Sequence, residues 1–529
     1  MNINFLTGLI ICSVFVNTSV LGQTPTFHLD VAPIIYNNCT QCHRVGEIGP
    51  MPLTTYEEVS AYGSFIEFVT ASGYMPPWTP DHTYTTLVGE RVLSDDDIQT
   101  IADWVAGGML EGNIDDNPGL PEFPTGSQIG EPDLILSMAE PYIHGGDNEE
   151  QYQVFIIPTG VTETKEIQAV EIRPGNFNIA HHGLVGYTNN PISFSAAEAM
   201  DAADPAPGYE SFGDYGVDVE EFLFGGWVPG TPPMVTPPTI GKFMEPGSQL
   251  LLQMHYGPSS IEQSDLTEIN IFFADEPITR EVQTEMMTTM DLSVPFYIPA
   301  NEISVFHGTR YVSDDISMLS ITPHSHLLGK SWLVYATSSD NQDTIPIIYI
   351  PDWDFHWQGI FTFPQLLHIP GGYTINAIAE YDNTVSNPDN PNNPPQDAYW
   401  GDFTTDEMFV MFAQYVNYLP GDEEISSTSI EDNVEFVFTD EKLMPAWPNP
   451  AIANSNLTIG FSLRSNPAEV TIELFDINGK RISVLLESKK YDLGSHLINV
   501  TLPNLSSGSY IYRMITSSGY VSSKLLEVQ

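Results

Sequence analysis

Three histidines in the first half of the chain have the spacing and surroundings of metal ligands. His181 and His182 are adjacent, and His255 ends an apolar stretch that begins at Leu250. Neighbouring residues of a regular strand point to opposite faces, so one metal can bind both adjacent histidines only where the backbone bends. Gly183 predicts such a bend. The alternative for the pair is that one histidine is buried and the other exposed. The alternative for His255 is that it is an ordinary core residue that binds no metal.

Two further motifs lie in the second half. His324 and His326 are separated by one residue, so on a strand both project from the same face and can share a metal. Met408 ends the segment GDFTTDEM and enters a predicted strand. Packing alone would also explain this methionine. Histidines with one thioether and no thiolate suit copper, cycling between Cu(I) and Cu(II), better than zinc.

A different chemistry is indicated near the N-terminus, where Cys39-Thr40-Gln41-Cys42-His43 has the C-x-x-C-H pattern. The two thiols can form thioethers to a haem, and His43 can bind its iron. The competing interpretation is a redox C-x-x-C that happens to precede a histidine. Since the chain has no other cysteines beyond Cys12 in its first residues, we favour covalently bound haem c.

The sixth iron ligand should be a thioether or a second imidazole. Met75 is the preferred candidate because two prolines follow it and stiffen its loop. Met51 is the weaker candidate, and His28 and His82 are further alternatives. The histidines at 144, 307, 356 and 368 are scattered, and no chemistry is assigned to them.

Short helices should surround the haem segment, residues 24–115. Thr55 and Glu58 form a predicted capping box that opens a helix ending near Gly73. Ser94 should cap a second helix that stops at the Gly107-Gly108 pair. Small helices around a C-x-x-C-H motif make this segment resemble the c-type cytochromes.

The composition predicts an exported, folded chain. It has 529 residues, of which 42% are hydrophobic, enough for packed cores in several domains. The 69 acidic and 16 basic residues leave a net charge of -53, which repels nucleic acid. Residues 1–22 are read as a signal peptide, and no later stretch is long and apolar enough to span a membrane. We therefore expect passage through the periplasm of a bacterium.

Residues 116–127 are rich in proline and glycine and predict a linker. From 128 to 438, short apolar runs alternate with turn residues, which favours antiparallel β-sandwiches over βαβ units. The length of this region predicts two sandwiches, residues 128–290 and 291–438.

Residues 446–529 form another predicted β-domain after the boundary at Trp447-Pro448-Asn449-Pro450. Val470, Ile472 and Leu474 alternate with polar residues, and Asn478-Gly479 predicts a hairpin turn. An ordinary binding module, such as a carbohydrate-binding domain, is one interpretation. The pattern also resembles the C-terminal sorting domain of the bacterial type IX secretion system. That resemblance implies the secretion machinery as a partner, and secretion to the cell surface or medium.

Taken in order, the metal-binding motifs of the central region resemble the copper type II, ascorbate-dependent monooxygenases. This family includes peptidylglycine α-hydroxylating monooxygenase and dopamine β-monooxygenase. The resemblance implies two sandwich domains that face each other across a solvent-filled cleft, each with one copper ion. It implies that one copper stores electrons and that the other binds oxygen and substrate. The electron-transfer ligands would be His181, His182 and His255. The catalytic ligands would be His324, His326 and Met408.

The chain departs from this family at several positions. The relatives are disulfide-bonded, whereas this chain has no cysteines to spare. The peptidylglycine enzyme anchors its substrate's carboxylate with an arginine where this chain has Thr322. Val410 and Phe412 replace its helper asparagine and tyrosine. A neutral or apolar substrate is therefore expected.

The resulting hypothesis is a secreted copper monooxygenase that hydroxylates a C–H bond with O₂. It would carry two copper ions and one haem c, receive electrons from an external donor, and pass them from the haem to the copper sites. A tethered donor has a high effective concentration. One alternative is a non-catalytic protein for surface electron transfer or copper handling. Another is an adhesion protein whose sandwiches bind glycans and whose metals are structural.

Overall fold

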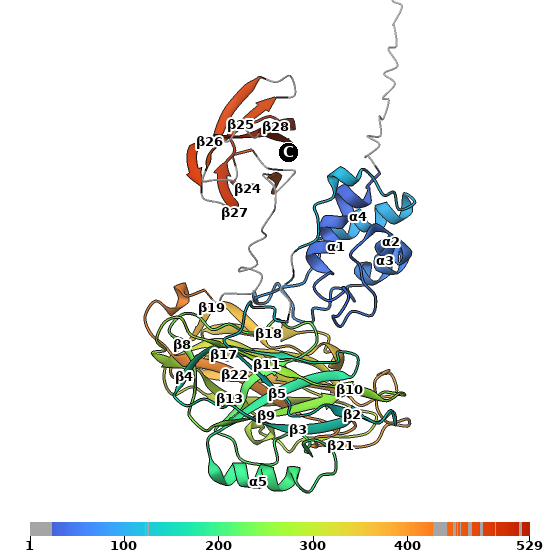
Figure 1. Ribbon diagram of the computed structural model, residues 1–529, viewed down its shortest axis with the longest axis vertical. Helices are drawn as coiled ribbons and strands as arrows, with labels where there is room; N and C mark the ends of the chain where they lie inside the picture. Colours follow the sequence, from blue (N-terminus) through green and yellow to red (C-terminus); the bar gives the residue numbers. More distant parts are fainter. Residues whose placement is uncertain are drawn as a thin grey trace, which may run out of the picture. The chain divides into compact units, whose positions relative to one another are not determined.

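The computed structural model describes residues 24–426, apart from 122, 124 and 125, and most of residues 442–528. Within the second range it omits 448–450, 452, 455, 464–467, 477–479, 492–493 and 518–520. The expected signal peptide, part of the linker and the Asn478-Gly479 turn therefore lie outside the described residues. The described chain forms two compact units (Figure 1). One contains the residues up to Pro76 and Leu93–Leu120, and the other Pro77–Val92 and everything from Pro121 onward.

The first unit is helical. Its elements are the π-helical turn η1 (Phe27–Val31), the helices α1 (Ala32–Asn38), α2 (Tyr56–Ala61), α3 (Gly63–Ala71) and α4 (Asp95–Ala106), and the 3₁₀ turn η2 (Ile114–Asp116). The predicted capping box is present, since Thr55 accepts from the Glu58 N–H and the Glu58 side chain accepts from the Thr55 N–H. Ser94 caps α4 as predicted, and Gly107 ends it. The single helix expected from Thr55 to Gly73 is instead two helices, which meet at Tyr62.

The helical unit has its own core, in which Phe27, Ile35, Ile101 and Trp104 are completely buried. Residues on both sides of the 77–92 segment build it. The Phe27 N–H donates to the Leu110 carbonyl, and α4 contacts both α3 and η1. The first unit therefore needs residues 93–120 to complete its core.

Residues 77–92, here called the strap, belong to the second unit. Leu87 is 3% exposed within the core of the second sandwich, and the Trp78 ring meets the Phe361 ring edge-on at 5.9 Å. The strap backbone is also bonded to the sheets, through the N–H of Asp81 to Tyr349 and of Val88 to Thr362. The stretch 24–115 is therefore interrupted in space, although it is continuous in sequence.

The first sandwich consists of two five-stranded sheets. One sheet has the order β1 (Leu134–Ser137), β11 (Glu268–Phe273), β4 (Lys165–Arg173), β8 (Ile240–Met244) and β12 (Arg280–Glu281). The other has the order β6 (Tyr209–Glu210), β3 (Gln151–Pro158), β9 (Gln249–Tyr256), β5 (Ala180–Thr188) and β7 (Glu221–Trp227). The sheets pack face to face, with Ile172 of β4 against Gly183 of β5. The short pair β2 (Tyr142–His144) and β10 (Gln263–Asp265) and the helix α5 (Pro191–Asp201) complete this part.

The second sandwich consists of two four-stranded sheets. One has the order β13 (Gln283–Met287), β22 (Val410–Asn417), β16 (Ile316–His324) and β19 (Phe361–Ile369). The other has the order β15 (Ile303–Tyr311), β20 (Thr374–Asp382), β17 (Gly329–Thr337) and β18 (Thr344–Ile350). Smaller elements are β14 (Tyr297–Ile298), β21 (Ala398–Tyr399) and the 3₁₀ turns η3 (Thr289–Asp291), η4 (Phe355–Trp357) and η5 (Asp422–Glu424). Because β13 pairs with β22, the chain changes sandwich between β12 and β13, a few residues before the expected boundary at 290.

Buried polar contacts join the two sandwiches. The Lys242 ammonium donates to Glu221 at 2.7 Å, and Thr284 donates to the same carboxylate at 2.7 Å. Gln414 of β22 donates to the Leu223 carbonyl at 3.1 Å. A second ion pair connects Arg280 and Asp422 at 2.7 Å. Buried charges of this kind are tolerated only when they are paired, so the contacts specify how the sandwiches sit together.

The C-terminal residues form a separate small sandwich. One sheet has the order β23 (Lys442–Trp447), β24 (Asn456–Leu463) and β27 (Gly494–Thr501). The other has the order β26 (Arg481–Tyr491), β25 (Ala468–Asp476), β28 (Gly508–Thr516) and β29 (Val521–Val528). The predicted alternation is confirmed, because Val470, Ile472 and Leu474 are all completely buried.

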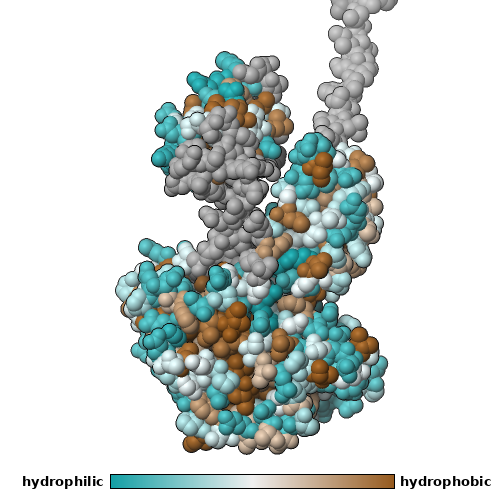
Figure 2. Space-filling view, in the orientation of Figure 1, coloured by the Kyte–Doolittle hydropathy of each residue, from teal (hydrophilic) through white to brown (hydrophobic). Residues whose placement is uncertain are grey.

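Hydrophilic and hydrophobic residues are interspersed over the face of the molecule seen in Figure 2. Among the residues that the structure describes, no helix has the length and apolarity of a membrane span.

Shortening Leu87 to alanine should destabilise the second unit, although sequence places Leu87 within the haem segment. Loss of a fully buried leucine side chain costs about 3 kcal/mol in free energy of unfolding. Urea unfolding followed by the circular dichroism of the β-sheets measures this. Val92→Ala is the matched control, because Val92 is 46% exposed. This substitution should change the free energy of unfolding by less than about 0.5 kcal/mol. Equal effects of the two substitutions would show that the strap is not part of the core.

Candidate metal centres

A β-bulge brings His181 and His182 to one site. In the pairing of β5 with β9, Ala180 lies opposite Tyr256 and His182 lies opposite His255, so the register shifts at His181. The extra residue lets two adjacent side chains turn toward the same partner strand. The bend expected at Gly183 is therefore found earlier, at His181. Gly183 is instead required for packing, because a Cβ there would lie 2.9 Å from the Met254 sulfur.

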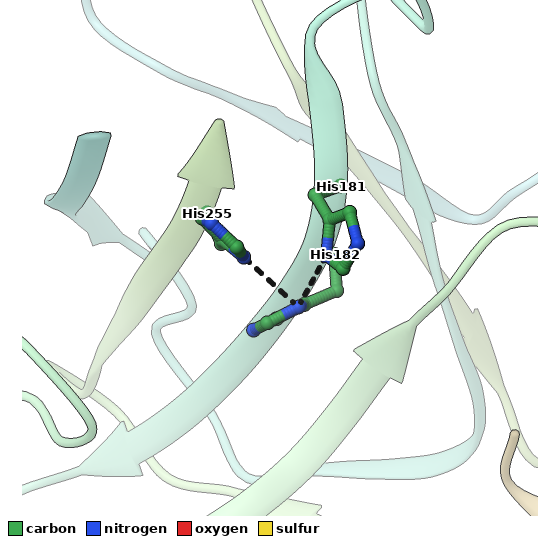
Figure 3. Close-up of side chains that lie close together, drawn as sticks. All are labelled: His181, His182 and His255. Carbon is green, nitrogen blue, oxygen red and sulfur yellow. Dashed lines mark hydrogen bonds between the residues drawn. The ribbon is translucent and has the colours of Figure 1, made fainter. Parts of the chain in front are cut away.

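The three imidazoles converge through their Nδ1 atoms (Figure 3). Nδ1 of His182 lies 3.2 Å from Nδ1 of His181 and 3.4 Å from Nδ1 of His255. Nitrogen ligands about 2 Å from one metal ion, at angles of 90–120°, lie roughly 2.8–3.5 Å apart. Both separations from His182 fall in this range, and the ligand nitrogens of all three residues lie within 4.8 Å of one another, so the three histidines form a candidate site for one ion.

The surroundings keep these imidazoles neutral. Burial lowers the pKa of His181 to about 4 and holds the pKa of His182 and of His255 well below the usual value. Neutral imidazole is the form that binds a metal. The Tyr152 ring stacks on His255 at 4.1 Å, and a Glu150 oxygen lies 3.8 Å from its Nε2. This distance is too long for a hydrogen bond, and the buried Nε2 of His255 has no hydrogen-bond partner among the described residues.

The second set lies where β16 and β22 pair. His324 is the last residue of β16 and stands opposite Val410, two residues after Met408. The rings of His324 and His326 lie 5.2 Å apart, and His326 follows the end of the strand. All three expected ligands line one cavity. The structure therefore brings His324, His326 and Met408 together from segments about 80 residues apart in sequence.

Hydrogen bonds indicate which nitrogen of each histidine is available. Nδ1 of His324 lies 2.5 Å from the Gln358 amide oxygen, and Nδ1 of His326 lies 3.3 Å from the Asp406 carbonyl. Both partners can only accept, so each Nδ1 carries the proton. In both rings, Nε2 then carries the lone pair that can bind a metal.

Glu407 links the two segments that carry these ligands. Its carboxyl oxygens accept from the N–H of His326 at 2.5 Å, of Leu328 at 2.9 Å and of Met408 at 2.7 Å. The side chain is completely buried, and burial raises its pKa to about 8 against the opposing effect of these donors. One acidic side chain thus holds the backbone of a histidine ligand and of the methionine ligand.

A second buried network supports the same segments. The Tyr381 hydroxyl donates to the Met408 carbonyl at 2.8 Å and accepts from Ser325, which in turn accepts from the Trp332 indole. Ser325, between the two histidines, is completely buried. These bonds restrict the motion of the ligands.

A cavity of about 470 Å³ connects the two sets. His182 lines it together with His324, His326 and Met408. Its remaining walls are largely apolar and aromatic, and include Leu184, Phe212, Phe222, Trp227 and Ile360. Thr322, Val410 and Phe412, the positions at which this chain departs from the copper monooxygenases, also line it.

In the helical unit, the C-x-x-C-H motif follows α1. No disulfide joins Cys39 and Cys42, and burial raises the pKa of the Cys39 thiol to about 12. A redox C-x-x-C needs a thiolate of low pKa, so this environment is unfavourable for dithiol exchange. Nδ1 of His43 donates to the Met51 carbonyl at 3.1 Å, which leaves Nε2 free for a metal.

The candidate axial ligands differ in their surroundings. The Met51 carbonyl holds His43, and the Met51 side chain packs against the helical core. Met75 is partly exposed in the loop after α3. His28 is buried and lies 2.7 Å from the Asn117 amide, whereas His82 is exposed in the strap.

The four histidines without an assigned chemistry have ordinary partners. His144 bonds to the Glu149 carbonyl, His307 to Asn376, His356 to Asp354 and His368 to Asp315.

Residues 445–528 match the family described as the secretion system C-terminal sorting domain. The chain carries a type IX secretion sorting domain. It is therefore a secreted or cell-surface bacterial protein. The match covers the small C-terminal sandwich and none of the metal-binding motifs.

The remaining comparisons find no close relative. No curated protein sequence matches the chain. Among solved structures, CopC from Methylosinus trichosporium OB3b is 23% identical over 17% of this chain and 91% of its own, with a TM-score of 0.12. The β-glucuronidase of Parabacteroides merdae and the β-D-mannosidase of Dictyoglomus thermophilum are 10% and 11% identical, each over 43% of this chain, with TM-scores of 0.14. The chain spans less than a third of the length of either glycosidase (28% and 29%).

Sequence reasoning missed Glu407, Gln358 and Phe355. Glu407 lies in the GDFTTDEM motif next to the methionine, so an acidic neighbour of a ligand was the available signal. Gln358 and Phe355 lie about 30 residues after the His324 motif and about 50 before Met408, and no pattern links them to either.

Replacing Glu407 with glutamine should weaken copper binding at the His324 set by about 10–100-fold. The amide places an N–H₂ group where the backbone N–H groups need an acceptor. Chelator competition with each copper monitored separately gives the two affinities. Glu150→Gln is the matched control: Glu150 is an acidic residue near the other set, and its replacement should leave the His324 set at wild-type affinity. If Glu407→Gln leaves the His324 set at wild-type affinity, Glu407 has no positioning role.

Proposed function

We propose that this chain is a secreted copper-dependent monooxygenase. It would insert one oxygen atom of O₂ into a substrate C–H bond and release the other as water, with two electrons and two protons from outside. The observation that supports this most directly is the cavity onto which His182, His324, His326 and Met408 all open. A protein that only stored copper or passed electrons would not need an apolar chamber of about 470 Å³ between its two ligand sets.

Each ligand set suits a different task. Copper held by the three Nδ1 atoms of His181, His182 and His255 would store an electron, since imidazoles tolerate both Cu(I) and Cu(II). The thioether of Met408 would favour Cu(I), the state that reacts with O₂, so His324, His326 and Met408 would hold the copper that supplies the oxygen chemistry. Gln358 and the Asp406 carbonyl hold the His324 and His326 rings, and Glu407 holds their backbone.

The cavity walls indicate the substrate class. Phe412 and Val410 present apolar surface beside the His324 set, and Phe222 stacks on Phe412 at 5.6 Å. Thr322 offers a hydroxyl but no positive charge. These walls favour a neutral, mainly apolar molecule over one with a free carboxylate.

The helical unit would supply electrons through a covalently bound haem. Cys39 and Cys42 would form the thioethers, and His43 would bind the iron through Nε2, because its Nδ1 is bonded to the Met51 carbonyl. The backbone of Met51 is engaged with His43 and its side chain packs against the helical core, whereas Met75 is partly exposed in the loop after α3. Met75 is therefore the preferred candidate for the sixth ligand.

Substitution of Met408 by isoleucine should abolish product formation by removing the thioether while keeping a side chain of similar size. Copper at the His181 set should remain bound. The test supplies ¹⁸O₂ and a reductant to the copper-loaded chain with a panel of neutral apolar substrates, and measures label in the products by mass spectrometry. Absence of label with the wild-type protein, at full copper loading, would favour the non-catalytic alternative. Label at the wild-type rate with Met408→Ile would remove Met408 from the site.

Replacing Met75 with alanine should lower the haem reduction potential by on the order of 0.1 V and change the reduced-minus-oxidised spectrum. Loss of a thioether ligand destabilises the ferrous state. Spectroelectrochemical titration measures both. Met51→Leu is the control and should leave the axial ligation unchanged. An unaltered potential in Met75→Ala would exclude this ligand.

A further inference from the structure

One short turn contacts both ligand sets. In η4, the Phe355 ring stacks on His181, with centroids 5.1 Å apart and planes 23° apart. The same ring meets His326 edge-on at 5.9 Å. Phe355 therefore lies between a histidine of the first sandwich and a histidine of the second.

The two histidine sets are close enough that one copper ion could bind imidazoles of both unless something keeps the sets apart. His182, His324 and His326 line the same cavity, and Phe355 is part of its wall. A single phenyl ring spans the gap between them, with its centroid 5.1 Å from the His181 ring and 5.9 Å from the His326 ring. Cu(II) prefers four ligands in a tetragonal arrangement. A copper ion that could reach imidazoles of both sets would gain a fourth nitrogen, and two one-metal sites would become one.

The turn holds the ring in this position. Asp354 caps η4 by accepting from the His356 N–H at 2.8 Å. The Gln358 amide donates to the Phe355 carbonyl at 2.9 Å, while its oxygen accepts from His324. Phe355 is only 8% exposed. The residue that orients His324 thus also fixes the backbone of Phe355.

We propose that Phe355 is a positioning residue whose ring keeps the two histidine sets apart as separate one-metal sites within a single cavity. The inference rests on the proposed function, because it requires that both sets bind copper. A ring that merely filled the core would have no effect on whether the two metals interact.

Electron paramagnetic resonance of the full chain loaded with Cu(II) tests this. The wild type should bind two Cu(II) per chain and show no half-field transition, a signal that neither an isolated Cu(II) nor a low-spin ferric haem produces. Phe355→Ala removes the ring, Phe355→Leu keeps part of its bulk, and Phe355→Tyr keeps the ring. Phe412→Ala is the matched control, since Phe412 lines the same cavity but has its stacking contact with Phe222.

The expected result is coupling in Phe355→Ala, seen as a half-field transition or as loss of signal intensity with two coppers still bound. The proposal would also be supported if Phe355→Ala bound only one copper per chain and pulsed electron paramagnetic resonance showed more than three imidazoles bound to that copper. Phe355→Tyr and Phe412→Ala should resemble the wild type. Two uncoupled coppers in Phe355→Ala, or one copper with three imidazoles or fewer, would overturn the proposal. If this variant does not fold, Phe355→Leu is judged by the same outcomes. A wild type that binds fewer than two coppers contradicts the proposed function itself.

Discussion

The candidate site depends first on the β-bulge at His181. A regular strand would send His181 and His182 to opposite faces of its sheet, and only one could meet His255. The shifted register between β5 and β9 places His182 opposite His255 and turns His181 toward the same point. The ligand nitrogens of the three histidines then lie within 4.8 Å of one another. Without the bulge, the candidate site would lose one of its three imidazoles.

The second constraint is the joint between the sandwiches, because each sandwich contributes one ligand set. Any rotation of one sandwich against the other would change the cavity and the distance between the sets. The described residues contain no disulfide with which to prevent this. The contacts across the joint are the ion pair of Arg280 with Asp422 and the hydrogen bond from Thr284 to Glu221, whose charge is paired with Lys242 inside the first sandwich. Such pairs contribute little net stability, but they penalise other arrangements, since separating them leaves a buried charge without a partner.

Much of the fold was predictable, because it is local. The capping box at Thr55, the Ser94 cap, the alternation at residues 470–474, and the change from helical to strand patterns all follow from residues close in sequence. The candidate ligands could be named from sequence because histidine is scarce and the motifs are short, and the structure places His324, His326 and Met408 around one cavity. The residues that position them were not. Phe355 and Gln358 reach the site only through the fold of the second sandwich, and nothing local distinguishes them from other loop residues. The register shift at His181 is likewise a property of two paired strands, so the bend was assigned to the nearest glycine.

The strap shows a further limit of local reasoning. Trp78 and Leu87 are apolar residues in a segment flanked by helices, and their sequence is compatible with a helical core. Which core they join depends on tertiary packing, and they join the second sandwich. As a result, the chain passes between the helical unit and the sheet unit three times, at residues 76–77, 92–93 and 120–121. If one flexible linker joined the units, the length of that linker would set the effective concentration of a tethered donor. Three passages join the two units here, so the tethering proposed for a haem-bound donor does not rest on one linker.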